Sequence, residues 1–158
     1  YSATSGDLFD AAATRDLWNY YNRVPRFMNK IQGTNSWNYT TDTWRAPNAA
    51  SVSVRAVTGW PEVMTEMNVQ CPVINSTGGV MVGVGVGVNS TTVNSAQIFG
   101  ATAGANVGFV ACTYRGYPAV GLNTFEWLER SAATGTTTWY GDNGVTNLQS
   151  GINGIALG

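Results

Sequence analysis

The stretch GGVMVGVGVGVNS, residues 78–90, alternates valine with glycine over most of its length. In an extended chain, side chains at period two point to the same side, so the valines form one apolar face. The opposite face carries Met81 and the glycines Gly83, Gly85 and Gly87. Glycine weakens a strand because it loses much backbone entropy and adds no packing. We therefore predict that a ring or a neighbouring chain closely approaches this glycine face.

The glycines of residues 78–90 do not match known phosphate-binding motifs. They are spaced G-x-G-x-G, whereas a dinucleotide fingerprint requires G-x-G-x-x-G and a P-loop requires G-x-x-x-x-G-K-[ST]. Valine at every second position also favours a strand over a loop. We therefore do not expect a nucleotide cofactor.

The composition predicts one domain with a neutral surface. We expect residues 1–16 to form an N-terminal arm or the start of a helix, and residues 17–158 to form a single β-sandwich domain. Charged residues make up 11% of the chain, and its net charge is −1. An ordinary globular domain has about 25% charged residues. Nucleic acid is therefore not an expected partner, and part of the surface is expected to be covered by other subunits.

The chain contains no run of about 18 apolar residues, so we expect no membrane insertion. Its first ten residues lack the basic and apolar regions of a signal peptide. The two cysteines, Cys71 and Cys112, are far apart and do not have metal-ligand spacing. Cys112 has the same parity as Val110 and Tyr114, which favours a buried thiol over a disulfide.

Helical periodicity is confined to the N-terminal part of the chain. Residues 7–24 are predicted to form a helix that Asp7 or Thr14 caps and Pro25 ends. The rest of the chain contains short β-rich runs separated by Gly, Pro, Asn and Asp about every ten residues. The fold class predicted is mainly β: an antiparallel β-sandwich or jelly roll with one N-terminal helix. The expected strands are 26–31, 36–45, 51–57, 62–71, 80–88, 95–103, 106–114, 123–131, 136–141 and 152–158.

The chain contains no histidine, which excludes Ser-His-Asp and Cys-His catalysis and His-ligated zinc. Carboxylate pairs remain, but in a strand Glu126 and Glu129 would point to opposite faces. Glu62 and Glu66 share a face, in a run that reads equally well as a solvated edge. The run GDNG at 141–144 is interpreted as a turn. We therefore predict no catalytic residue, no metal site and no cofactor.

Aromatic residues recur in short motifs, with six Trp, seven Tyr and five Phe. Most can belong to the core, where a sandwich buries Trp and Tyr with their polar ends satisfied. Exposed rings beside amides and arginines would instead suit a sugar platform, because apolar sugar faces stack on them. Trp60 in TGWP, and Arg115 and Tyr117 in RGYP, are the candidate glycan-binding residues.

An ordered set of motifs resembles a domain found near the C-termini of tailed-bacteriophage virion proteins, such as tail fibres and capsid-associated proteins. The motifs are LWNYYNRVPR, SWNYTTDTWRAPN, VGVGVNSTTVNSA, YRGYPAVGLNTFEWLE, ATGTTTWYGDNG and LQSGINGIALG, which run from about Leu17 to Gly158. The resemblance implies a virion location, other virion proteins as partners and a homotrimer. It supplies no catalytic residues.

The function predicted is therefore that of a non-enzymatic virion surface module, either a fibre or a capsid-decoration protein. It would oligomerise and either attach to a host surface glycan or reinforce the particle. The alternative is a glycan hydrolase or carbohydrate-binding module that uses aromatic loops and a carboxylate pair. A trimer would provide one partner for the close-packing face of Gly83, Gly85 and Gly87, and a ring such as Trp37 or Trp44 would provide another.

Overall fold

The computed structural model describes residues 10–21, 23–97, 99–103 and 106–157, and it is mainly β, as predicted. A single 3-10 turn, Pro47–Ala49, is present among these residues. The strands are β1 (Asp10–Ala11), β2 (Thr14–Arg15), β3 (Pro25–Gln32), β4 (Ser36–Tyr39), β5 (Ser53–Thr58), β6 (Thr65–Asn75), β7 (Val80–Val88), β8 (Phe99–Ala103), β9 (Gly108–Gly116), β10 (Gly121–Arg130), β11 (Thr137–Tyr140) and β12 (Ser150–Leu157).

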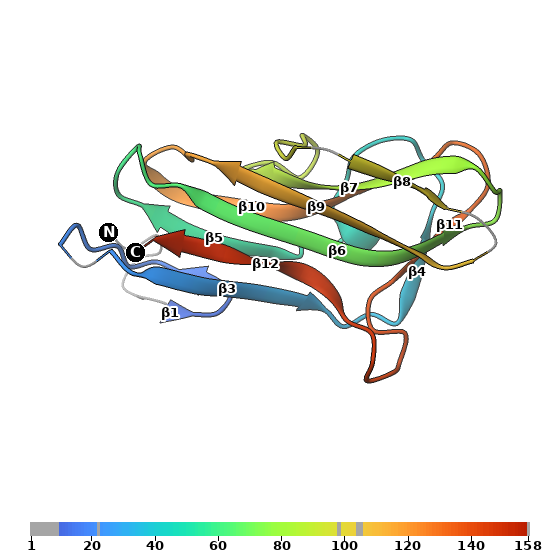
Figure 1. Ribbon diagram of the computed structural model, residues 1–158, viewed down its shortest axis with the longest axis horizontal. Helices are drawn as coiled ribbons and strands as arrows, with labels where there is room; N and C mark the ends of the chain where they lie inside the picture. Colours follow the sequence, from blue (N-terminus) through green and yellow to red (C-terminus); the bar gives the residue numbers. More distant parts are fainter. Residues whose placement is uncertain (1–9, 22, 98, 104–105, 158) are drawn as a thin grey trace.

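The strands form two sheets that lie over one another (Figure 1). The first sheet has the order β1-β2-β5-β10-β7-β8. The second has the order β3-β12-β6-β11-β4, and β9 pairs with the other edge of β6. The pairs are antiparallel apart from β2 and β5, which run parallel. An isolated bridge between Gln97 and Thr113 links β9 to the segment before β8.

The core lies between the two sheets and is built from the alternation of each strand. On β7 the valines Val82, Val84 and Val86 are buried. Trp127 of β10 meets Trp37 of β4 across the interface, with ring centroids 5.9 Å apart. This inward-facing set explains why short alternating runs fold as two layers.

The predicted N-terminal helix is wrong. Within residues 10–16 the chain forms the short strands β1 and β2, and the expected residues 7–9 lie outside the described part. Residues 17–21 and 23–24 form no regular element. Long-range pairing overrides the local helical pattern, because β2 adds to β5 and the Asn29 amide donates to Ala12 O at 2.7 Å.

The glycine face of β7 is approached by its own chain. A Cβ atom at Gly85 would lie 2.5 Å from Asn94 Oδ1, and one at Gly87 would overlap the Ser90 carbonyl oxygen. Residues 89–97 therefore fold back over this face as a cover. The approach predicted at Gly85 and Gly87 is provided by this segment rather than by Trp37 or Trp44.

Candidate ligand-binding pocket

The third glycine of this face, Gly83, is buried and lines a pocket beside the loop of residues 40–44. This loop follows β4 and is held at both of its ends. The Tyr39 hydroxyl contacts Thr43 O at 3.0 Å and Thr43 Oγ1 at 2.7 Å. On the far side, Arg45 pairs with Glu129 of β10 through two backbone hydrogen bonds of 3.1 and 2.9 Å. The two attachments fix the loop against the end of β10.

Glu129 anchors the loop through its side chain as well. Its carboxylate is fully buried and accepts hydrogen bonds from Trp37 Nε1 at 2.6 Å and Arg45 Nε at 2.8 Å. The Arg45 guanidinium also lies 3.6 Å from the centroid of the Tyr39 ring. Burial raises the pKa of Glu129 to about 7, although Trp37 and Arg45 favour the charged form.

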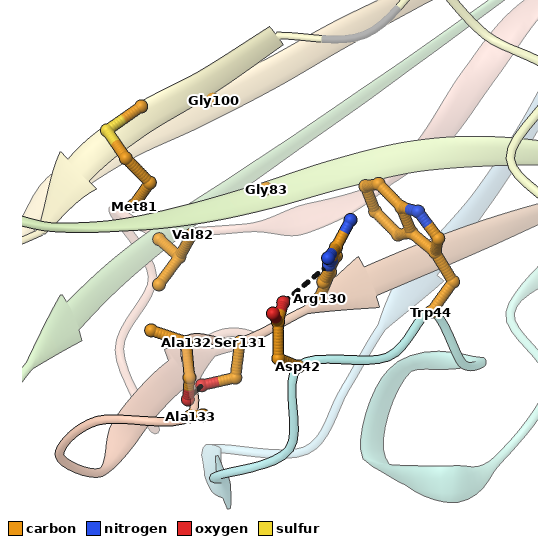
Figure 2. A pocket seen from close by; sticks show the side chains of 10 residues that line it. All are labelled: Asp42, Trp44, Met81, Val82, Gly83, Gly100, Arg130, Ser131, Ala132 and Ala133. Atoms are coloured by element: carbon orange, nitrogen blue, oxygen red, sulfur yellow. Dashed lines mark hydrogen bonds and ion pairs between the residues drawn. The ribbon is translucent and has the colours of Figure 1, made fainter.

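The pocket lies between the 40–44 loop and the first sheet and has a volume of about 440 Å³ (Figure 2). Gly83 of β7 and Gly100 of β8 contribute only backbone to it, so they leave the space open. The other lining residues are Asp42, Trp44, Met81, Val82, Arg130, Ser131, Ala132 and Ala133. The volume lies in the range of about 300–1,000 Å³ that small-ligand sites occupy.

Three side chains give the pocket its chemistry. Arg130 Nε donates to Asp42 Oδ1 at 2.6 Å, and the Arg130 guanidinium lies 5.9 Å from the Trp44 ring centroid. Figure 2 shows the Arg130 side chain between the Trp44 ring and the Asp42 carboxylate. The hydrogen bond from Arg130 lowers the pKa of Asp42, so both groups are charged at neutral pH. The pocket thus presents an aromatic surface, hydrogen-bond acceptors and hydrogen-bond donors side by side.

Trp60, the first predicted glycan residue, lies in a different aromatic group. It is 43% exposed in the turn between β5 and β6, and its ring centroid is 6.0 Å from that of Tyr20. The Trp18 ring packs against Gly59 in the same turn. The structure therefore brings the motifs LWNYY and TGWP together at one end of the sheets.

The other two predicted glycan-binding residues, Arg115 and Tyr117, make no described contact with the aromatic group of Trp60. Arg115 is on β9, where its Nε donates to Glu66 Oε2 at 2.8 Å on the outer face of the second sheet. Tyr117 is exposed in the loop between β9 and β10. None of the ring contacts described in the structure joins Tyr117 to Trp60.

The carboxylates considered for catalysis do not converge in the described pockets. Glu126 and Glu129 lie on opposite faces of β10, as their spacing predicts. Glu126 is buried and accepts bonds of 2.7 Å from Ser51 Oγ and from the Val52 amide. Burial raises the pKa of Glu126, and these two bonds oppose the rise. Glu126 lines a pocket beside residues 89–92, but no second carboxylate lines that pocket, and Glu129 is bound to Trp37 and Arg45.

The sequence analysis named Trp44 as a ring that could cover the face of Gly83, Gly85 and Gly87, and it missed Asp42 and Arg130. The run TTDTWR between two strands offered a signal, because it combines an aromatic ring with a carboxylate in a segment rich in threonine. Their partner Arg130 follows 88 residues after Asp42 in the chain. The bridge between Arg45 and Glu129 and the hydrogen bonds of the Glu129 side chain bring the two segments together.

Among the described residues, no helix is suited to crossing a membrane. Within the same residues, no cluster of three or more carboxylate or thiol side chains is arranged to hold a metal ion.

Comparisons with known proteins give little similarity. No protein-family model matches the chain, and no curated protein matches it. Among solved structures, the C-terminal domain of EclA, a sugar-binding protein, is 9% identical with a TM-score of 0.33. That match covers 70% of this chain and 77% of the other. Values this low carry no argument about fold or function.

Proposed function

We propose that this chain is a non-enzymatic virion surface module of the β-sandwich or jelly-roll type that attaches to a glycan. The pocket formed by Trp44, Asp42 and Arg130 is the observation that supports glycan binding. The motif resemblance to tailed-bacteriophage surface proteins supports the virion context. Neither glycan binding nor a virion location requires a catalytic residue.

The chemistry of the pocket fits a sugar ring better than a lipid or a nucleotide. A pyranose has an apolar face that can stack on Trp44 and hydroxyls at its rim that can bind polar side chains. The Asp42 carboxylate accepts hydrogen bonds from hydroxyls, and the Arg130 guanidinium donates to ring or hydroxyl oxygens. Asp42 and Arg130 are already paired at 2.6 Å, so binding orders few new side chains.

The binding test uses a glycan array followed by calorimetry with the best oligosaccharide. Trp44→Ala removes the stacking surface, and we expect at least about a tenfold loss of affinity. Asp42→Asn keeps the size of the side chain but removes its charge, and it should weaken binding as well. Trp60→Ala is the matched control, because this exposed tryptophan lies in the separate aromatic group.

Two results would overturn the glycan proposal. One is the absence of binding to any oligosaccharide by the folded protein. The other is binding that Trp60→Ala abolishes and Trp44→Ala leaves intact, which would move the site to the other aromatic group. Mass spectrometry and antibody labelling of purified particles test the virion location separately.

A further inference from the structure

The strands β3, β12, β6 and β9 lie side by side (Figure 1), and none of their residues lines the proposed pocket. Strand register aligns their outward side chains in three rows across the four strands. We call this surface the amide face. Its rows are Phe27, Ile155, Glu66 and Arg115; Asn29, Asn153, Asn68 and Thr113; and Ile31, Gly151, Gln70 and Ala111.

The amide face exposes large apolar side chains. Phe27 is 68% exposed, Ile31 is 51% exposed and Ile155 is 39% exposed. Phe27 and Ile155 are directly paired across β3 and β12, so they form a continuous apolar patch. Exposed apolar patches of this kind, rimmed by polar groups, mark interaction surfaces.

The same face is electrically neutral and offers both hydrogen-bond donors and acceptors. Its two charged members, Glu66 and Arg115, pair with each other at 2.8 Å. The central row consists of three asparagines and one threonine, and Thr113 Oγ1 donates to Asn68 Oδ1 at 2.6 Å. Amide groups both donate and accept, so a surface of this composition is complementary to itself.

We propose that the amide face binds a second copy of this chain in a two-fold contact, in place of the homotrimer that the motif resemblance implies. An axis along the asparagine row would place the large Ile155 opposite the small Gly151 of the other copy. It would place Phe27 opposite Ile31, and Asn153 opposite its own counterpart. A two-fold contact requires this self-matching of one patch, because both partners present the same surface.

The chemistry favours a protein partner of this kind over a glycan. The exposed apolar residues are phenylalanine and isoleucine, which pack against side chains, and the face has no Trp or Tyr for sugar stacking. Strand spacing makes the three rows about 19 by 20 Å, so the contact would bury about 760 Å² in total, which is below the range of stable interfaces and in that of weak, transient ones. The expected dimer is therefore weak, with a dissociation constant in the micromolar range.

Sedimentation over a micromolar concentration series tests the contact. We expect a monomer–dimer equilibrium that Ile155→Asp weakens about tenfold or more, because it buries an unpaired charge. Val93→Asp is the control, since Val93 is 61% exposed in the segment that covers the other sheet. Circular dichroism melts confirm that each variant is folded.

Cross-linking tests the position of the axis. Asn153→Cys should give a covalent dimer with a short bismaleimide, whereas Thr146→Cys, at an exposed site off the face, should not. The native Cys71 and Cys112 are buried and do not compete. A monomer throughout the series, or an oligomer that Ile155→Asp leaves intact, would overturn the proposal. Sugar binding is unaffected by either result.

Discussion

At the scale of single residues, the notable feature is a buried acid that holds the pocket loop. Glu129 is fully buried, and its hydrogen bonds with Trp37 and Arg45 join β4, the 40–44 loop and β10. A buried carboxylate loses its hydration, which raises its pKa, and the hydrogen bonds from Trp37 and Arg45 offset only part of that rise. The position of Asp42 and Trp44 therefore depends on a group that does not line the pocket.

The raised pKa of Glu129 predicts a pH dependence of stability. Its pKa is about 7 in the folded protein against an ordinary value of 4.5, so the folded state holds the proton more tightly. The favourable contribution of Glu129 to the free energy of unfolding is therefore largest below pH 4.5, and it is lost as the pH rises through 7. We expect urea denaturation to show a decline on the order of 1–3 kcal/mol between pH 5 and pH 8.

Glu129→Gln is the variant that assigns this dependence. Glutamine does not titrate, so the decline in stability with pH should become smaller. Part of the decline should remain, because burial also raises the pKa of Glu126. Asp42→Asn serves as the control, because the pKa of Asp42 is already lowered and the group stays charged over this range. An undiminished decline in Glu129→Gln would contradict the assignment.

At the scale of elements, β7 and the segment that follows it form one packed unit. Asn94 Oδ1 accepts hydrogen bonds from the Val86 amide at 3.2 Å and the Ala96 amide at 2.9 Å. Its side chain thereby occupies the space that a Cβ at Gly85 would need. Position 85 therefore requires glycine, because the Asn94 side chain lies too close to admit a Cβ atom.

A double-mutant cycle tests this coupling. Gly85→Ala should destabilise the protein by about 1–3 kcal/mol, because the new methyl group displaces the Asn94 side chain. In an Asn94→Ala background the obstacle is gone, so the same change should destabilise it less. Gly33→Ala is the control, since no atom lies within 4 Å of its added Cβ. Additive effects in chemical denaturation would show that Asn94 is not the obstacle.

At the scale of the whole molecule, the two sheets enclose both thiols. Cys71 and Cys112 are free and buried, as the parity of Cys112 predicts. Burial raises the pKa of each thiol to about 12, so the reactive thiolate is scarce in the folded protein. Cys71 is on β6 and Cys112 is on the neighbouring strand β9, and both face the core.

Thiol labelling should therefore report the opening of the whole domain. We expect neither cysteine to react with iodoacetamide in the folded protein at neutral pH, and both to react at the same rate as urea is added. Peptide mass spectrometry after timed quenching distinguishes the two sites. Rapid labelling of Cys112 alone in the absence of urea would show that β9 separates from β6 locally.

The sequence by itself determined the β class, most strand positions and the inward-facing valines of β7, because period-two alternation reports burial directly. It also placed Glu126 and Glu129 on opposite faces of one strand. Long-range pairing decided the rest. The pattern at 7–24 favours a helix locally, but residues 10–15 pair as strands, with β2 against β5. Asp42 and Arg130 meet because Glu129 binds Arg45 and Trp37 across the two sheets, and no local pattern predicts a contact over that separation.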